Sequence, residues 1–223
     1  MNKRILVVAA HADDEALGCG GTIAKYVSDG DEVHLVFLAD GVTSRDGVDI
    51  NEVEDRRAAA ENSQNILGVK SATYLGLPDN SLDTIPLLKI VKSLEEIIRN
   101  FLPSIIYTHH SEDLNIDHRI TYQAVITACR PVPGLSVREI YSFEVISSTD
   151  WSASTSRKFN PQLYTNITNY IDIKVRSLEA YRYEMREHPH SRSIEHALAL
   201  AKHRGLSMGC DYAESFEVIR ILN

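Results

Sequence analysis

Residues 4–22, RILVVAAHADDEALGCGGT, decide the fold of this chain. The first part, residues 5–10, is a run of β-branched and small apolar residues, typical of a strand that is buried on both faces of a parallel sheet. Ionisable side chains begin where this strand is expected to end: His11, Asp13, Asp14 and Glu15. Ligands bind outside the carboxyl ends of the strands in open α/β sheets, so the stretch predicts a functional site directly after the first strand.

The rest of the chain alternates buried strands with amphipathic helices. The residue patterns predict strands at 32–39, 72–77, 104–108 and 138–146, helices at 15–29, 52–67, 87–101, 119–129 and 169–187, and surface loops at 42–51 and 151–161. No internal repeat or low-complexity linker divides the 223 residues. We therefore expect a single domain over residues 1–223, with an α/β, Rossmann-like three-layer fold and a mainly parallel sheet.

The composition favours a small-molecule partner. A formal net charge of −8, with no run of Lys or Arg, argues against a nucleic-acid groove or an anionic membrane surface. No apolar stretch reaches the roughly 20 residues of a transmembrane helix, and the first strand is shorter than the roughly 7 to 15 residues of a signal-peptide core. The three cysteines are widely separated, which is typical of a reducing compartment. We expect a cytoplasmic protein, and association into a homo-oligomer stays open.

A second group of histidines and acids follows the fourth expected strand. Residues 109–118 are HHSEDLNIDH, and the helical pattern after them places Asp117 and His118 near a helix N-terminus. An imidazole and a carboxylate three residues apart, such as those of His11 and Asp14, can share one divalent ion. His118 then supplies a third ligand, because both groups are expected at the ligand-binding edge of the sheet. An acid left over beside these ligands can serve as a base.

Three parts of the chain carry the pattern of a known family. The first comprises His11-Ala12-Asp13-Asp14-Glu15 and Leu17-Gly18-Cys19-Gly20-Gly21-Thr22, and the second comprises Thr108-His109, Asp113, Asn115 and Asp117-His118-Arg119. The third, which is weaker, comprises Arg192-Ser193, Arg204-Gly205 and Tyr212-Ala213-Glu214-Ser215-Phe216. Together they resemble the PIG-L/LmbE family of zinc-dependent sugar N-deacetylases. The resemblance extends over the whole chain and implies an LmbE-like fold.

The resemblance implies a metal-dependent hydrolase that acts on amides. It implies that His11, Asp14 and His118 hold a divalent ion, usually Zn²⁺, although another ion such as Fe²⁺ would also fit. It also implies that Asp13 is the general base. Two nitrogens and one carboxylate leave zinc an open position for water, and Asp13 can take a proton from this water as it attacks an amide carbonyl. The implied reaction removes an N-acetyl, or another N-acyl, group from an amino-sugar derivative.

The chain departs from the family pattern at two positions. Ala12 stands where Pro is common, a change that touches no ligand. Asn115 stands where some members have a His, and an amide can donate a hydrogen bond to an oxyanion but cannot supply a proton. We predict instead that His109, oriented by Asp113 or Asp117, is the general acid. The predicted catalytic residues are therefore Asp13, His109 and Asp117.

The residues expected to bind the substrate are Arg56, Asp79, Asn115 and Arg192. Arg56 begins a helix, and the resemblance suggests that it contacts the distal group of the substrate. Asp79 lies in a Leu-Pro-Asp turn at a strand end, where the family has an acid that holds sugar hydroxyls. Arg192 and Glu214 are expected to line the sugar pocket.

Two further motifs have a structural interpretation. Gly18, Gly20 and Gly21 imitate a dinucleotide-binding loop, but the acids before them would repel a pyrophosphate. We expect these glycines to allow close packing of a helix on the sheet. The stretch 188–190, His-Pro-His, imitates a metal motif, but its prolyl bend predicts a loop.

Two functional alternatives remain at this stage. One is an amidase that acts on another small amide, such as a thiol conjugate or a cell-wall fragment. It shares every catalytic residue with the deacetylase and differs only in the loops. The other is a non-enzymatic Rossmann-like binding module, which would bind no metal at the sheet edge.

Overall fold

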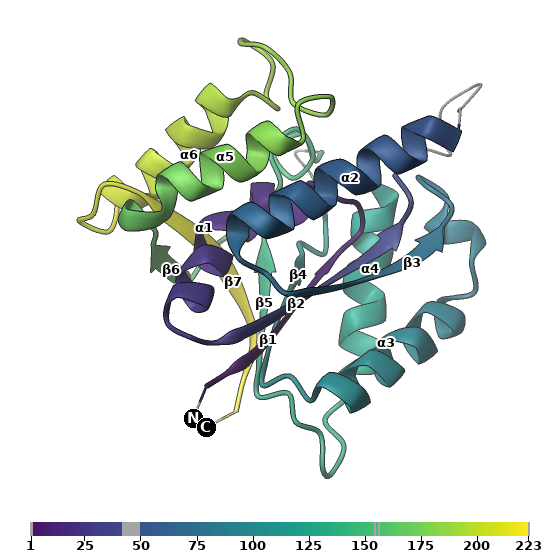
Figure 1. The fold of residues 1–223 in the computed structure, drawn as a ribbon. Coiled ribbons are helices and arrows are strands. Elements are labelled where there is room, and N and C mark those ends of the chain that lie inside the picture. The colour runs from purple at the N-terminus through teal and green to yellow at the C-terminus, as the bar shows by residue number, and fades with distance from the viewer. Residues whose placement is uncertain (1, 42–49, 154, 156, 223) are drawn as a thin grey trace.

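The computed structural model describes residues 2–41, 50–153, 155 and 157–222. Strands and helices alternate along these residues, as Figure 1 shows. In chain order, with η for a 3₁₀ helix, the elements are β1 (Arg4–Ala9), α1 (Asp14–Ser28), β2 (Glu32–Ala39), α2 (Ile50–Leu67), β3 (Ser71–Leu77), η1 (Leu82–Thr84), α3 (Leu87–Phe101), β4 (Ile105–His109), α4 (Ile116–Ala128), β5 (Glu139–Phe143), β6 (Leu163–Asn166), η2 (Thr168–Tyr170), α5 (Ile171–Ala180), α6 (Ile194–Leu206) and β7 (Ala213–Ile221).

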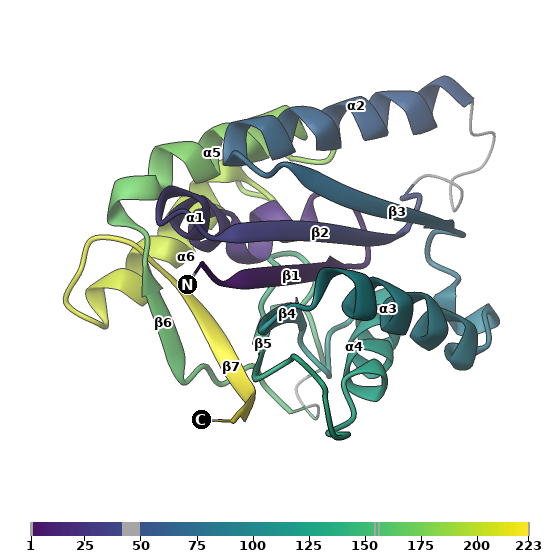
Figure 2. The ribbon, with the colours of Figure 1, turned by 60° about the horizontal axis from the view of Figure 1, so that its bottom comes forward.

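A sheet with the strand order β3-β2-β1-β4-β5-β7-β6 forms the middle layer. The strands β1 to β5 pair in parallel, whereas β7 is antiparallel to β5 and to β6. The helices α1, α2, α5 and α6 cover one face, and α3 and α4 cover the other (Figure 1, Figure 2). This arrangement confirms the predicted three-layer α/β fold. The strand order reverses between β1 and β4, which is the point where doubly wound sheets bind ligands.

Strand β1 is buried on both faces because its side chains alternate between two hydrophobic cores. Ile5 and Val7 belong to the core under α1, α2 and α5. Leu6 and Val8 belong to the core under α3 and α4. A strand of this kind has no polar face, which explains the continuous apolar run in the sequence.

The agreement between expected and observed elements decreases along the chain. The helix predicted at 87–101 coincides with α3, and the C-cap residue that follows it, Leu102, has the left-handed conformation. The helix predicted at 169–187 is too long, because α5 ends at Ala180 and Tyr181 leaves helical geometry. The sequence patterns did not predict β6, α6 or β7. Most of the loop expected at 42–51 lies outside the described residues, and α2 already begins at Ile50.

Helix α1 is interrupted at Cys19, where the backbone is not helical. A buried ion pair caps both sides of the interruption. Lys174 Nζ donates to the carbonyls of Ala16 and Leu17 before the break, at 3.0 and 2.8 Å. After the break, the Glu214 carboxylate accepts hydrogen bonds from the amides of Gly21 and Thr22, at 2.9 and 2.7 Å. The structure therefore places Glu214 at a helix break, where both oxygens of its carboxylate accept hydrogen bonds.

The glycines of α1 bring this helix close to its neighbours. A Cβ atom on Gly18 would collide with the ring of Phe143 in β5. A Cβ atom on Gly21 would lie 2.7 Å from the Cδ1 atom of Ile167. These contacts confirm the expectation of close packing for Gly18 and Gly21, whereas a Cβ atom on Gly20 would make only ordinary contacts, the nearest at 3.5 Å.

The structure also bears on the expectations for membrane-spanning segments and for the cysteines. In the part of the chain that the structure describes, no helix is both long and apolar enough to cross a membrane. Cys19, Cys129 and Cys210 all carry free thiols.

Candidate active site

The two histidine motifs converge where the carboxyl ends of β1 and β4 lie side by side. His11 and Asp14 come from the turn between β1 and α1, and His118 comes from the first turn of α4. The Asp14 Oδ2 atom lies 3.3 Å from His11 Nδ1 and 3.3 Å from His118 Nε2. One ligand atom from each of the three residues lies within 4.8 Å of the other two. This spacing allows all three side chains to contact one cation.

The other nitrogen of each imidazole faces a carboxylate. His11 Nε2 lies 3.1 Å from Asp79 Oδ1 and 3.1 Å from Asp117 Oδ2. His118 Nδ1 lies 3.2 Å from Asp113 Oδ1. A carboxylate behind a metal-binding imidazole fixes the orientation of the ring and raises its basicity, so this arrangement is typical of a metal centre.

Acidic groups dominate the electrostatics of this centre. Burial lowers the pKa of His118, but Asp14 and Asp113 more than offset the effect and raise the pKa to about 9. Burial also lowers the pKa of His11, yet hydrogen bonds to Asp117 and Asp14 bring it well above its usual value. The centre therefore stabilises positive charge. Two imidazole nitrogens and one carboxylate oxygen are a donor set that fits Zn²⁺ or another divalent ion.

Asp13 directs its carboxylate toward two arginines. Arg192 Nη1 donates a hydrogen bond to Asp13 Oδ2 at 3.0 Å, and Arg56 Nη2 lies 3.9 Å from Asp13 Oδ1. Burial raises the pKa of the Asp13 carboxyl, and Arg192 offsets only part of this increase. Although Asp13 stands at the N-cap position of α1, its side chain makes no capping hydrogen bond. The carboxylate therefore faces Arg192 and Arg56 instead of capping the helix.

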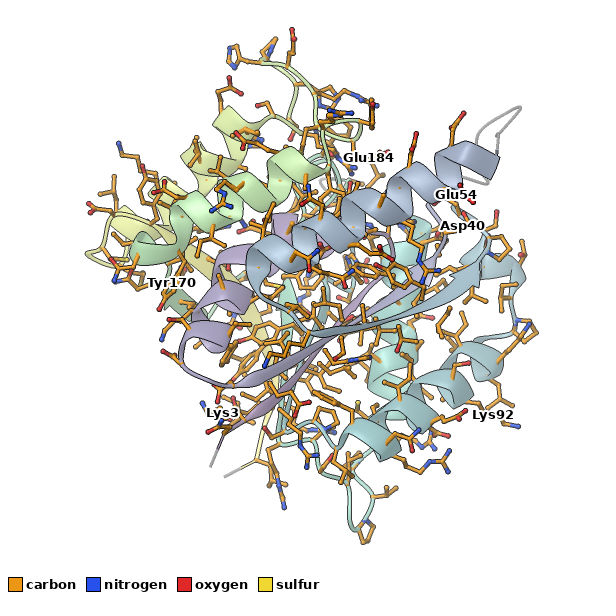
Figure 3. All side chains as sticks on the ribbon, viewed as in Figure 1. Lys3, Asp40, Glu54, Lys92, Tyr170 and Glu184 are labelled. Atoms are coloured by element: carbon orange, nitrogen blue, oxygen red, sulfur yellow. The ribbon has the colours of Figure 1, made fainter. Side chains whose placement is uncertain are left out.

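Arg56 connects Asp13 to a cavity of about 420 Å³. Its Nη1 atom lies 2.7 Å from Glu184 Oε1. Figure 3 labels Glu184 close to α2, the helix that carries Arg56. Tyr181 and Tyr183 add aromatic walls to the cavity. Its volume lies within the roughly 300 to 1,000 Å³ that small-molecule pockets usually have.

Asn115 and Asp117 organise the start of α4. Asn115 Oδ1 accepts a hydrogen bond from the Asp117 amide at 2.8 Å, which makes Asn115 the N-cap. The Asp117 carboxylate accepts hydrogen bonds from the amides of Asn80 and Leu82, at 2.7 and 3.0 Å. Asp117 therefore links the start of α4 to the turn that carries Asp79. The Asn115 amide group donates to Asn80 Oδ1 at 3.2 Å, at the exposed rim of the site.

His109 lies against a predicted metal ligand and is fully buried. Its ring stacks on that of His118 with 3.9 Å between the centroids. The Nε2 atom accepts a hydrogen bond from the Ala10 amide at 2.8 Å, and Nδ1 has no partner among the described residues. Burial, together with the charge of His118, brings the pKa of His109 well below its usual value. Because Nε2 is engaged by the Ala10 amide and the ring stacks on His118, the position of His109 favours support of His118.

Three residues near Asp13 received no role from the sequence patterns: Glu15, Tyr181 and Glu184. Glu15 is fully buried and accepts hydrogen bonds from the Asp13 amide and the Tyr181 hydroxyl. Burial is the main reason that the pKa of Glu15 rises to about 7. A third consecutive acid after a buried strand could have indicated Glu15. Nothing in the local sequence distinguishes Tyr181 or Glu184 from their neighbours.

Comparisons with known proteins identify the family of this chain. The model of the PIG-L family, described as GlcNAc-PI de-N-acetylase, matches residues 6–129, which is more than half of the chain. A protein of Escherichia coli strain K12, named as the uncharacterized deacetylase YaiS, is 31% identical over 189 residues, covering 81% of this chain and 92% of that protein. This chain belongs to the PIG-L family.

Two more proteins are similar to this PIG-L protein over nearly its full length. The diacetylchitobiose deacetylase of Thermococcus kodakarensis is 26% identical over 233 aligned positions, covering 97% of this chain and 83% of that enzyme. The crystal structure of the conserved protein TT1542 from Thermus thermophilus has a TM-score of 0.79 at 25% identity, covering 98% of this chain and 96% of that one. The similarities confirm the LmbE-like fold and the expectation of an enzyme, a hydrolase that acts on amides. They do not favour the binding module.

Proposed function

We propose that this PIG-L protein removes an N-acetyl group from an amino-sugar derivative with the help of a bound divalent ion, which we assign as Zn²⁺. The observation that carries the proposal is the convergence of His11, Asp14 and His118 on one point beside the Asp13 carboxylate. The family description and the diacetylchitobiose deacetylase both name N-acetylated amino sugars, which supports this substrate class. The three free thiols are consistent with a reducing compartment, and we propose that the protein acts in the cytoplasm.

His11, Asp14 and His118 would hold the ion, and Asp79, Asp113 and Asp117 would fix the orientation of the two imidazoles. When bound, the ion supplies Lewis-acid chemistry, acidifying water and polarising the amide carbonyl.

Asp13 handles the protons of the reaction. Its carboxylate accepts a proton from the attacking water and returns it to the nitrogen of the departing amine. Arg192 holds the carboxylate in place through its 3.0 Å hydrogen bond. The Arg192 side chain is also 22% exposed, so it can meet the substrate directly. This assignment lets one residue act as base and then as acid, and it needs no proton from His109.

The sugar ring binds in the cavity of about 420 Å³ next to Asp13, and Arg56 lines this cavity. Arg56 is held by Glu184 and can donate hydrogen bonds to a distal group of the substrate. Asp79, beside His11, accepts hydrogen bonds from sugar hydroxyls. Asn115 contributes its amide at the rim.

The proposal is tested by acetate release from a panel of N-acetylated sugars: N-acetylhexosamines, N-acetylated disaccharides and nucleotide sugars. We expect release by zinc-loaded protein, loss after chelation and recovery when zinc is returned. Replacement of the base, Asp13→Asn, should lower turnover ~10²- to 10⁴-fold without changing zinc content. Acetate release from none of the sugars, with cleavage of a non-sugar amide, would replace the substrate class. An Asp13→Asn variant within about threefold of wild type would remove Asp13 as the base.

A further inference from the structure

The backbone of Asp13 has a conformation that non-glycine residues rarely adopt. Its φ angle is 124° and its ψ angle is −28°. Such a conformation is strained and persists only where the surroundings impose it. Because Asp13 immediately precedes the predicted ligand Asp14, the strain lies in the segment that sets the direction of both carboxylates.

Hydrogen bonds hold the Asp13 peptide groups on both sides. The Asp13 carbonyl accepts hydrogen bonds from the amides of Ala16 and Leu17, at 3.1 and 2.9 Å. The Asp13 amide donates to Glu15 Oε2 at 3.0 Å. At most helix starts an Asp in this position would use its own carboxylate as the cap. Here Glu15 reaches back to the N-cap amide, as the Glu of a capping box does, and the Asp13 carboxylate makes no capping bond.

Glu15 is itself fixed from the opposite side. Its Oε1 atom accepts a hydrogen bond from the Tyr181 hydroxyl at 2.7 Å and a longer one from Ser63 Oγ at 3.4 Å. Ser63 belongs to α2, and Tyr181 directly follows α5. Glu15 and Ser63 are fully buried, and Tyr181 is 1% exposed. Side chains from α2 and from the residue that follows α5 thus determine where the Glu15 carboxylate lies.

From these contacts we infer that Glu15 is a positioning residue: with Tyr181, it holds the strained backbone of Asp13 so that the Asp13 carboxylate points at the reacting amide. Both Glu15 oxygens are engaged by hydrogen-bond donors, so the role requires acceptor atoms at fixed positions and not proton transfer. The inference rests on the proposed function of Asp13 as the base.

Two substitutions of Glu15 separate positioning from chemistry. Glu15→Ala removes both acceptors and should lower kcat ~100-fold, as misplacement of a reacting group by about 1 Å does, while KM and zinc content stay near wild type. Glu15→Gln keeps an acceptor for the Asp13 amide and offers an NH₂ group to the Tyr181 oxygen. It should stay within about fivefold of wild type.

Tyr181→Phe keeps the ring in the cavity wall but removes the hydroxyl that supports Glu15, and it should lower kcat ~10-fold. Tyr26→Phe is the matched control, because Tyr26 also shares a hydrogen bond with another residue, the Tyr107 hydroxyl at 3.0 Å, but lies outside the site. We expect wild-type kcat for this control. If Glu15→Ala fails to fold, Tyr181→Phe still tests the inference.

Two results would overturn the positioning role: kcat within about threefold of wild type in both Glu15→Ala and Tyr181→Phe, or Glu15→Gln as inactive as Glu15→Ala. A double variant separates this failure from failure of the proposed function. If Asp13 is the base and Glu15 acts through it, Glu15→Ala should cause little further loss in an Asp13→Asn background. If Asp13→Asn alone is fully active, the base assignment fails first.

Discussion

Two buried groups of charged side chains lie along the first part of α1, and their charges are balanced in different ways. At the break in α1, Lys174 Nζ and Glu214 Oε1 are 2.5 Å apart, so one cation faces one anion. At the start of α1, the carboxylates outnumber the arginines that face them, and imidazoles fill the space between. The first group is electrostatically complete within the protein. The second favours an additional cation.

The difference separates a structural site from a functional one. A buried charge is costly unless a partner and hydrogen bonds compensate it. Lys174 and Glu214 compensate each other and also satisfy the peptide groups exposed by the helix break. The cluster of His11, Asp14 and His118 has its compensation supplied from outside, by the ion that we propose. Substitutions in the two groups should therefore affect different properties.

The largest effect is expected at the metal cluster. Asp14→Asn removes a ligand charge while keeping its shape, so zinc content should fall from about one equivalent to near zero. Turnover should fall at least ~1000-fold, because the ion contributes several kcal/mol to the transition state. Zinc analysis and acetate release measure the two effects. Asp29→Asn, at the exposed end of the same helix, is the control. One equivalent of zinc bound by Asp14→Asn would rule out this ligand.

The next effect is on stability, at the helix break. Glu214→Ala leaves the buried Lys174 ammonium without its counter-charge and should lower the free energy of unfolding by ~3–5 kcal/mol. Glu214→Gln keeps an acceptor for the amide of Gly21 or Thr22. It should therefore lower the free energy of unfolding by less than Glu214→Ala does. Urea unfolding measures both. In the folded fraction, zinc content should remain that of wild type. Equal stability of Glu214→Ala and wild type would contradict a capping role for the pair.

A smaller effect is expected at His109, which stacks on a predicted ligand. His109→Ala should weaken zinc affinity ~10- to 100-fold, as loss of a residue that supports a ligand does. Turnover should recover when zinc is in excess. If His109 were the general acid, turnover at saturating zinc would stay ~100-fold below wild type. Kinetics over a zinc titration separate the two roles.

The smallest effect concerns the ion pair of His110 and Glu217, whose Nδ1 and Oε2 atoms are 2.8 Å apart. Burial raises the pKa of Glu217, but hydrogen bonds from His110 and the Asn160 amide bring it down to about 2. Burial lowers the pKa of His110, but Glu217 and the Arg157 carbonyl bring it above its usual value of 6.5. The contribution of Glu217 to the stability of the fold is present above its usual pKa of 4.5. It is lost as the pH falls toward 2.

The His110 contribution to stability is present below pH 6.5 and is lost as the pH rises through its raised pKa. Between pH 6 and pH 9, wild type should therefore lose about 1 kcal/mol more stability than His110→Gln, which cannot take a charge. Urea midpoints at the two pH values give the comparison, and titrations elsewhere cancel between the variants. Identical pH dependence would show that the pair contributes nothing through charge.

Local patterns predicted the parts of the fold whose burial is periodic. The helix α3 could be predicted because Ile90, Val91, Leu94 and Ile98 are buried on one face. The helix α6 could not, because it buries small residues, Ala197, Ala201 and Gly205, which leave no strong apolar stripe.

In the candidate site too, features within a short stretch of sequence could be predicted, whereas contacts between distant segments could not. Its predicted metal ligands lie in two short motifs that the sequence displays directly. Its supporting contacts join distant segments, such as Arg192 to Asp13 across 179 positions, and no spacing rule connects them. The role predicted for His109 came from its place at a strand end, since burial and stacking cannot be read from one sequence.

The Lys174–Glu214 pair also bears on the order in which the chain acquires its shape. Glu214 lies in the last strand, β7, and reaches back 193 positions to the Gly21 amide. During synthesis, residues 6–129 emerge with every predicted ligand before either member of the pair exists. Contacts between such distant segments form slowly. We therefore expect a nascent chain to display the motifs early and to become competent for zinc only when its final strand inserts between β5 and β6.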